Sequence, residues 1–352
     1  MNNTFFLGSS GPSGFKTDFG KIINKPGYYT YILKGGPGTG KSTLMKKIAS
    51  GCGEECDLYY CSSDIRSLDA VVMNKRKVII IDGTAPHTFD PSLPGISQEI
   101  INLGQFWKKD KLILHTDAIK FLFSENSAYH KRAQCCISTL SSLTEGLYSL
   151  GESTLLKDKL RGYAEKIVSG LPAVKKRKKY AAAEFRQLSA FTSYGYITRE
   201  LPENYSVYLL KDDLFTASDF LLKYISEKAS ENGYIVYISK CCAFDNSVYE
   251  HILIPELKTA FMSSGFFCEY ENKNGMNINL RRFYDKKILS EKKNYISFNR
   301  KAVTEIKTAV SEAIDTALSV HNELEKYYID SLDTERLNEF SETFSDNIKK
   351  EK

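Results

Sequence analysis

The sequence predicts an α/β fold made of two copies of one unit. Each copy is expected to be a three-layer arrangement of helices around a mainly parallel sheet, followed by a helical hairpin. Three observations predict this fold. A glycine-rich segment at 35–43 lies between a strand-like and a helix-like segment, an apolar run at 78–81 ends in Asp82, and the second half of the chain matches the first.

The composition is typical of a water-soluble globular protein that is long enough for two sizeable cores. The chain has 352 residues, of which 42% are hydrophobic and 26% charged, and its formal net charge is +5. No stretch approaches about 18 consecutive apolar residues, and the start lacks the features of a signal peptide. We therefore expect a cytoplasmic protein without a membrane segment. The modest charge makes nucleic acid an unlikely main partner.

The segment Gly35–Thr43 carries the clearest chemical signal. It is a complete G-x-x-x-x-G-K-[ST] phosphate-binding loop, preceded by an expected strand at 29–33 and followed by an expected helix through 44–49. Glycines bring successive N–H groups within reach of phosphate oxygens, and the helix that follows begins with unpaired N–H groups. The candidate nucleotide contacts are Gly35, Gly36, Pro37, Gly38, Thr39, Gly40, Lys41, Ser42 and Thr43.

The same segment and the apolar run predict a site for ATP and Mg²⁺. Lys41 would neutralise the β- and γ-phosphates, and the Ser42 hydroxyl would complete the shell of a bound Mg²⁺. The run 78–81 is typical of a strand buried on both faces, and an acid at its carboxyl end is where P-loop proteins hold the magnesium shell. Lys41 and Asp82 are thus the candidate catalytic residues, and Ser42 and Asp82 the candidate metal ligands.

The residue after Asp82 bears on the rate of hydrolysis. P-loop ATPases that polarise water with their own acid commonly carry a glutamate there, and this chain has Gly83. A fast motor-type ATPase is therefore disfavoured. Asp64, Glu99 or His87 could supply a base, and the sequence does not choose among them.

A second strand is expected at 57–61, and the residues after it are further candidates. Asp64 and Arg66 would lie at the carboxyl end of that strand, where they could contact substrate, metal or phosphate. The alternative is that Asp64 caps a helix while Arg66 lies on a solvated face. The eight cysteines contain no C-x-x-C pair, and ordinary buried thiols are favoured over zinc ligands.

Helices are expected in the rest of the first half. Ser97 is expected to cap one helix that packs on the sheet, and the spacing of apolar residues over 127–168 predicts a helical hairpin. The basic run at 175–179 is expected to be a solvated linker, with a nucleic-acid contact as the less favoured alternative.

The second half repeats the first. When the sequence is aligned with itself at two similar offsets, segments and single residues of the two halves match. They are Tyr31–Lys34 with Tyr208–Lys211, Leu44–Ile48 with Leu221–Ile225, Cys61 with Cys241, Glu145 with Glu325, and Tyr148 with Tyr328. The sequence therefore predicts a tandem duplication. The expected domains are 1–174, a P-loop domain with a helical hairpin, and 185–352, a degenerate copy with C-terminal helices, joined by a basic linker at 175–184.

The second copy lacks the residues that bind phosphate. Asp212, Ala217, Ser218, Asp219 and Phe220 stand in place of Gly35, Gly40, Lys41, Ser42 and Thr43, and Met262 stands in place of Asp82. Without the lysine, and with acids near the loop, this second site would repel phosphate. We expect one nucleotide per chain and a second half that buries or regulates the first, with binding of a different ligand as the alternative.

The sequence resembles a group of bacterial proteins built from two P-loop halves and described mainly as ATPases or ATP-binding proteins. The resemblance spans nearly the whole chain and rests on Lys34–Thr43, Tyr60–Asp64, Asp82–His87 and Ile254–Leu257. It implies a P-loop NTPase fold and ATP binding. The chain departs from a two-loop pattern in its second half, which argues against a two-site mechanism.

The favoured function is a slow Mg²⁺-dependent ATPase with one active nucleotide site in the N-terminal half. The alternatives are a small-molecule or nucleotide kinase, in which Asp64 and Arg66 orient an acceptor, and a non-enzymatic ATP-dependent switch. ATP is favoured over GTP because no N-K-x-D segment is present. The helical hairpins offer surfaces for a protein partner or for self-association.

Overall fold

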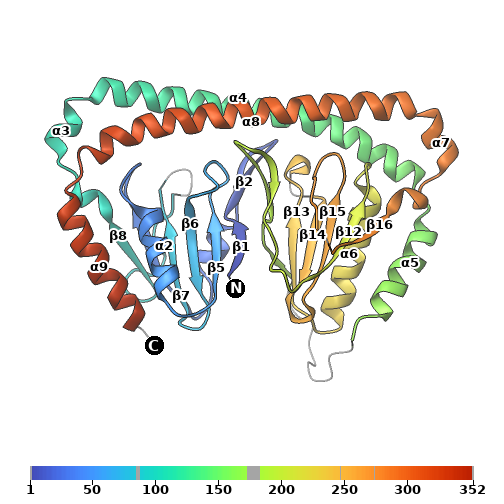
Figure 1. Ribbon diagram of the computed structural model, residues 1–352, viewed down its shortest axis with the longest axis horizontal. Helices are drawn as coiled ribbons and strands as arrows, with labels where there is room; N and C mark the ends of the chain where they lie inside the picture. Colours follow the sequence, from blue (N-terminus) through green and yellow to red (C-terminus); the bar gives the residue numbers. More distant parts are fainter. Residues whose placement is uncertain (1, 85–87, 173–182, 246, 273, 351–352) are drawn as a thin grey trace. The chain divides into compact units, whose positions relative to one another are not determined.

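The computed structural model describes residues 2–84, 88–172, 183–245, 247–272 and 274–350. These residues form an α/β structure with two mixed six-stranded sheets (Figure 1). The chain divides into two compact units. The first unit comprises Met1–Gly8, Phe15–Ala133 and Glu312–Lys352, and the second comprises Ser9–Gly14 and Gln134–Ser311. Among the described residues, no helix combines the length and apolar character needed to cross a membrane.

The units are composed differently from the domains expected at 1–174 and 185–352. The helical residues from 312 onward, expected with the second half, belong to the first unit, and the helical segments between residues 134 and 169, expected with the first half, belong to the second. An amphipathic helix is stable where its apolar face finds a complementary surface, and sequence order does not determine where that surface lies. The expected linker at 175–184 lies almost wholly outside the described residues.

The sheet of the first unit places several strand ends at one edge. In spatial order its strands are β1 (Asn3–Phe6), β5 (Cys56–Tyr60), β6 (Leu68–Met73), β7 (Val78–Asp82), β4 (Tyr29–Lys34) and β8 (Gln98–Asn102). The strand β6 runs antiparallel to both of its neighbours, whereas the other pairs are parallel. The carboxyl ends of β4, β5 and β7 therefore meet at the same edge, where ligands of such sheets bind.

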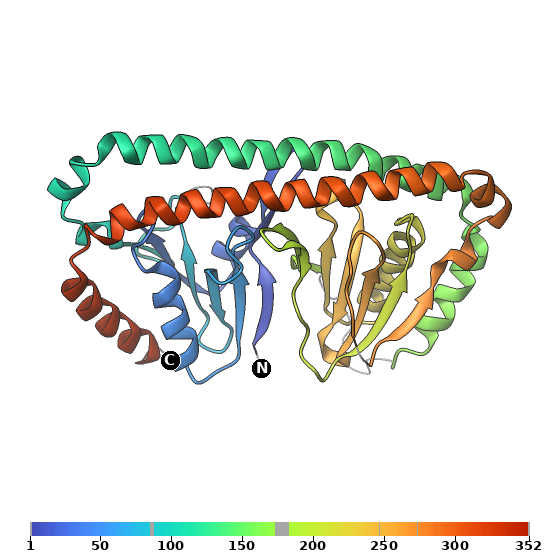
Figure 2. The same ribbon diagram turned by 45° about the horizontal axis from the view of Figure 1, so that its top comes forward.

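Two helices from opposite ends of the sequence cover this sheet. The helix α2 (Lys41–Gly51) packs on β6, and α9 (Thr334–Lys350) packs beside α2, as Figure 2 shows near the C-terminus. Within the buried core, the ring of Phe344 on α9 meets the ring of Tyr31 edge-on at 5.1 Å. The shorter helices of this unit are α1 (Phe19–Ile23), η1 (Leu103–Phe106) and α3 (Lys109–Ile113).

The prediction of a helix after Ser97 is wrong. The segment forms the edge strand β8, which pairs with β4, followed by the short helix η1. In β8 the side chains of Gln98 and Ile101 are buried, whereas those between them are exposed. The Asn102 side chain then accepts a hydrogen bond from the Gly104 N–H and starts the turn. By pairing with β4, this strand supplies hydrogen-bond partners to a row of β4 backbone groups that would lack them if the segment were a helix.

The second unit contains a sheet with the same pattern of strand directions. Its strands, in spatial order, are β9 (Ala183–Phe185), β13 (Val236–Lys240), β14 (Tyr249–Ile254), β15 (Thr259–Ser264), β12 (Ser206–Lys211) and β16 (Met276–Asn279). Here β14 runs antiparallel to both of its neighbours. The helix α6 (Thr216–Glu231) packs on β14 and β13, and α5 (Lys157–Ser169) packs against α6.

The remaining elements are two hairpins, two long helices and several short helices. The hairpins are β2 (Gly8–Gly11) with β3 (Gly14–Thr17), and β10 (Ser189–Thr192) with β11 (Gly195–Thr198). The long helices are α4 (Thr116–Thr154) and α8 (Lys293–Ile329), and the short ones are η2 (Cys242–Phe244), η3 (Pro255–Leu257), η4 (Leu280–Phe283) and α7 (Lys286–Glu291). The helices expected over 127–168 are present as α4 and α5, but α5 packs against α6 and does not fold back along α4 as the expected hairpin would (Figure 1).

The packing of α9 on the sheet gives a test of the first unit. Phe344→Ala removes a ring that is 8% exposed and should lower the free energy of unfolding by about 3–5 kcal/mol. The control is Phe298→Ala, which removes a ring that is 67% exposed and should change stability by less than about 0.5 kcal/mol. Urea denaturation of both variants measures the difference. Equal effects would contradict the packing of α9 described above.

Candidate functional site

The glycine-rich loop connects β4 to α2, as the sequence predicts. Gly38 and Gly40 have φ angles of 71° and 77°, in the left-handed region that favours glycine. Gly40 immediately precedes the first residue of α2. The backbone N–H groups at the start of α2 therefore face the loop, and the positive end of the helix dipole lies beside them.

Lys41 is held over this loop. Its Nζ donates to the carbonyl oxygen of Gly35 at 2.7 Å and to that of Gly36 at 3.0 Å. The same Nζ lies 3.6 Å from Oδ2 of Asp82, and the two side chains are only 11% and 16% exposed. The structure thus brings the two candidate catalytic residues together.

The neighbouring strands explain why Asp82 reaches the loop. The strand β7, which ends at Asp82, pairs directly with β4, and Asp82 is in register with Leu33. Asp82 Oδ1 accepts hydrogen bonds from the N–H and the hydroxyl of Thr84, at 2.9 and 2.5 Å. These bonds fix the carboxylate so that its other oxygen faces Lys41.

The hydroxyl-bearing residues of the loop have different surroundings. Ser42 Oγ accepts a hydrogen bond from the Leu68 N–H at 2.9 Å, so one of its lone pairs stays available to a metal. The Thr39 hydroxyl donates to the Gly36 carbonyl at 2.9 Å inside the folded loop, and its side chain is buried. Thr43 is exposed. Ser42 therefore has the surroundings of a ligand, whereas Thr39 holds the loop in shape.

Part of the site comes from the far end of the chain. The Gly38 N–H donates to Glu325 Oε1 on α8 at 3.1 Å. A Cβ built on Gly36 would lie 3.1 Å from the Trp107 ring and 3.6 Å from the Tyr328 ring, and one built on Gly38 would lie 2.8 Å from Cγ1 of Ile329. The last turns of α8 thus lie against the loop.

Electrostatics keep Glu325 ionised. The neighbouring His321 lowers the pKa of Glu325, and the Gly38 N–H and the charge of Lys41 act in the same direction, whereas burial opposes them. His321 Nε2 lies 3.6 Å from Oε1 of Glu325. The internal match of Glu325 with Glu145 was the one signal in the sequence that singled this residue out, and it carried no hint of a role at the loop.

Asp64 and Arg66 are bonded to each other. Asp64 Oδ1 accepts from the Arg66 N–H and from Arg66 Nε at 3.1 and 3.3 Å, and Oδ2 accepts from the Ser67 hydroxyl at 2.7 Å. Burial raises the pKa of Asp64, but these hydrogen bonds outweigh it and lower that pKa. Asp64 thus holds the turn after β5 together, which corresponds most closely to the capping alternative.

Of the other two candidate bases, Glu99 does not reach the site. Glu99 is in register with Tyr31 in the middle of β4, and its carboxylate lies 3.4 Å from the Tyr29 hydroxyl, away from the carboxyl end of the strand. Glu99 is therefore excluded as a base at the loop. His87 lies outside the described residues.

None of the family models, curated proteins or solved structures compared with this chain matches it. The assignment of the site rests on the chain's own residues and geometry.

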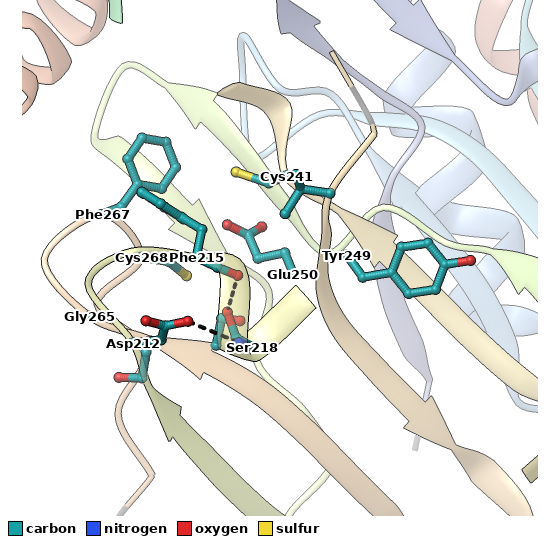
Figure 3. Close-up of a pocket in the computed structure, with 12 residues that line it drawn as sticks. Asp212, Phe215, Ser218, Cys241, Tyr249, Glu250, Gly265, Phe267 and Cys268 are labelled. Carbon is teal, nitrogen blue, oxygen red and sulfur yellow. Dashed lines mark hydrogen bonds between the residues drawn. The ribbon is translucent and has the colours of Figure 1, made fainter. Parts of the chain in front are cut away.

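The corresponding turn in the second unit is filled by its own acid. Asp212, which follows β12, accepts from the Ser218 N–H at 2.9 Å (Figure 3). It also accepts from the Leu214 N–H and from the Tyr284 hydroxyl, both at 3.0 Å. Its carboxylate thus occupies the Ser218 N–H in the first turn of α6, while the Ala217 N–H donates to the Tyr284 hydroxyl. The adjoining cavity measures about 20 Å³, room for about one water molecule.

Glu250, His251 and Cys268 form a buried cluster beside this cavity, with potential ligand atoms within 4.8 Å of one another. His251 Nδ1 accepts from the Ser263 N–H at 3.2 Å, so the proton of the neutral ring is on Nε2, which lies 2.8 Å from the Ser189 hydroxyl. The nitrogen that faces the cluster therefore carries a hydrogen and has no lone pair for a metal. The cluster fits a buried hydrogen-bond network.

Burial shifts the two acid–base groups of the network in opposite directions. It raises the pKa of Glu250 to about 7 and lowers the pKa of His251 to about 3. Between about pH 4.5 and 7 the unfolded chain has lost the proton of Glu250 while the folded chain keeps it, so this residue makes stability fall as pH rises. His251 acts in the opposite sense, because only the unfolded chain gains its proton as pH falls below about 6.5.

The effect of Glu250 can be isolated with Glu250→Gln, which keeps an oxygen to accept the hydrogen bond from Tyr196. The free energy of unfolding of the variant, relative to the native chain, should rise by about 3 kcal/mol between about pH 5 and pH 8. Urea denaturation at both pH values measures this change. The exposed control Glu227→Gln should show no such rise, and a pH-independent difference for Glu250→Gln would contradict the raised pKa.

Proposed function

We propose that the chain binds ATP together with Mg²⁺ at Gly35–Thr43 and hydrolyses the ATP slowly. The observation that supports this most strongly is the pairing of Lys41 with Asp82, at 3.6 Å, across two adjacent parallel strands. A lysine at the start of a helix after a glycine-rich turn, opposite an acid at a strand end, is the arrangement that phosphoryl-transfer sites use.

The residues have separate roles in this proposal. The N–H groups of the loop and Lys41 would hold the phosphates and stabilise the charge on the transferred group. Ser42 and Asp82 would hold Mg²⁺, which supplies further charge neutralisation. Asp82 is favourably placed because Thr84 fixes its Oδ1, while its Oδ2 faces Lys41 at the loop.

The residue after Asp82 supports a slow rate of ATP hydrolysis. Gly83, whose N–H donates to the Leu33 carbonyl, offers no side chain to polarise water. A Cβ at this position would lie 2.3 Å from Cγ2 of Ile32, so the packing accommodates no larger residue without rearrangement. Hydrolysis would then depend on positioning and electrostatics, which supports slow turnover.

We further propose that the two units are copies of one P-loop NTPase fold, one of them degenerate. The order β1-β5-β6-β7-β4-β8 corresponds strand by strand to β9-β13-β14-β15-β12-β16, with the antiparallel strand third in both. The isolated bridges agree as well: Trp107 pairs with Leu332 in the first unit, and Leu155 pairs with Tyr284 in the second. In each case a helix from one half of the sequence is anchored beside the sheet of the other half.

An ATP-dependent switch is the second candidate, and one observation favours it. Glu325, Tyr328 and Ile329 of α8 contact the loop, so a nucleotide there would act on this helix. The kinase alternative has no such support, because Asp64 and Arg66 bind each other. We also propose that the long helices α4 and α8 offer surfaces for a protein partner or for self-association.

Lys41→Ala should weaken ATP binding by roughly 10–100-fold, because a charge-assisted contact to phosphate is lost. The Asp82→Asn variant should still bind ATP, but Mg²⁺ should no longer increase its affinity for ATP, because a proposed ligand of the metal has lost its charge. Isothermal titration with ATP and GTP, with and without Mg²⁺, and phosphate release measure these effects. The control is Lys47→Ala on the same helix, where the side chain is 46% exposed and binding should not change. Native ATP affinity in Lys41→Ala would contradict the proposed site.

A further inference from the structure

We propose that Glu325 is an internal competitor for the nucleotide phosphates, and that ATP binds by displacing the last turns of α8 from the loop. The proposal rests on the proposed nucleotide site. It identifies a carboxylate, carried by a helix from the C-terminal part of the chain, as the group that occupies the phosphate position when no nucleotide is bound.

The first argument is competition for one donor. The Gly38 N–H lies inside the phosphate-binding motif and donates to Glu325 Oε1 at 3.1 Å. An N–H group makes one strong hydrogen bond, so a phosphate oxygen and this carboxylate oxygen cannot both accept it. A carboxylate is also the side chain that most closely resembles phosphate as an acceptor, because it carries negative charge on two oxygens.

The second argument is space. The hypothetical Cβ of Gly38 would lie 2.8 Å from Cγ1 of Ile329 and 3.2 Å from the Glu325 carbonyl oxygen, so α8 and the loop are in close contact there. On the other side of the loop, the rings of Trp107 and Tyr328 lie 5.2 Å apart beside Gly36. Phosphates that reach the Gly38 N–H must therefore move the α8 residues that cover it.

The third argument is charge. Glu325 is half-buried, with a side chain that is 35% exposed, and the Gly38 N–H, His321 and the nearby Lys41 favour its charged form. The same donor and the same lysine would serve the phosphates. Nucleotide phosphates beside Glu325 would repel it, so the two anions exclude each other both sterically and electrostatically.

The second unit shows what an acid fixed within the corresponding turn does. Asp212 belongs to the turn itself and accepts from the N–H groups of Leu214 and Ser218, so it cannot leave without unfolding that turn. Glu325 is supplied by a different element, and rotation of its side chain or a shift of α8 removes it. The first site is thus reversibly closed, whereas the second is closed permanently.

The test compares Glu325→Gln with the native chain and with Glu323→Gln, an exposed glutamate two residues away on the same helix. Glutamine keeps the size and an acceptor oxygen but removes the charge. We expect Glu325→Gln to bind ATP with Mg²⁺ about tenfold more tightly. We expect Glu323→Gln to bind like the native chain. Circular dichroism and the thermal midpoint confirm that both variants are folded.

A second readout reports the displacement directly. Trp107 is the only tryptophan in the sequence and contacts both the loop and Tyr328 of α8. Its fluorescence should change when a non-hydrolysable ATP analogue with Mg²⁺ is added, and Glu325→Gln should need less analogue to reach the same change. Lys41→Ala should lose the response.

The possible results separate the proposals. Unchanged or weaker ATP binding in Glu325→Gln would overturn the competition. Unchanged binding with lost turnover would instead make Glu325 a group that acts on the attacking water. Failure of the native chain and Glu325→Gln alike to bind ATP would overturn both this inference and the proposed function, whereas binding by Glu325→Gln alone would support a strongly closed native site.

Discussion

The backbone N–H groups between a strand and the helix that follows it are the constraint on which much of this structure depends. Such groups require an acceptor, because an unpaired buried donor is costly. In the second unit Asp212 supplies that acceptor from within the turn. In the first unit the glycine-rich turn has no acid of its own, and the acceptor at Gly38 comes from α8.

This difference distinguishes the turn between β4 and α2 from the turn between β12 and α6. Lys41 needs carbonyl and carboxylate oxygens around it, and Gly35, Gly36 and Asp82 provide them. The second unit has Ser218 at the position matched to Lys41, with its N–H bonded to Asp212. In the second unit an acid within the turn thus holds the N–H group matched to that of Lys41, and no lysine stands at this position.

Local features were readable from the sequence, and features that depend on distant residues were not. The strand, loop and helix around Gly35–Thr43 follow from residue types and spacing, and so does Asp82 at the end of β7. The sequence after Ser97 predicts a helix, whereas the segment is a strand, because it pairs with β4. Glu325 could not be placed at the loop, since no local pattern indicates which sheet α8 and α9 cover.

The C-terminal helical residues belong to the unit that contains the glycine-rich loop, so an N-terminal fragment lacks part of that unit. A fragment cut at residue 174, where the sequence suggests a domain end, would lack Phe344, Leu332 and Ile348, which are part of the core around Tyr31. It would also lack Glu325. Because a large apolar area would then be exposed, such a fragment would fail for reasons of stability before it reported on binding. Residues beyond 312 are as much a part of the first unit as the glycine-rich loop itself.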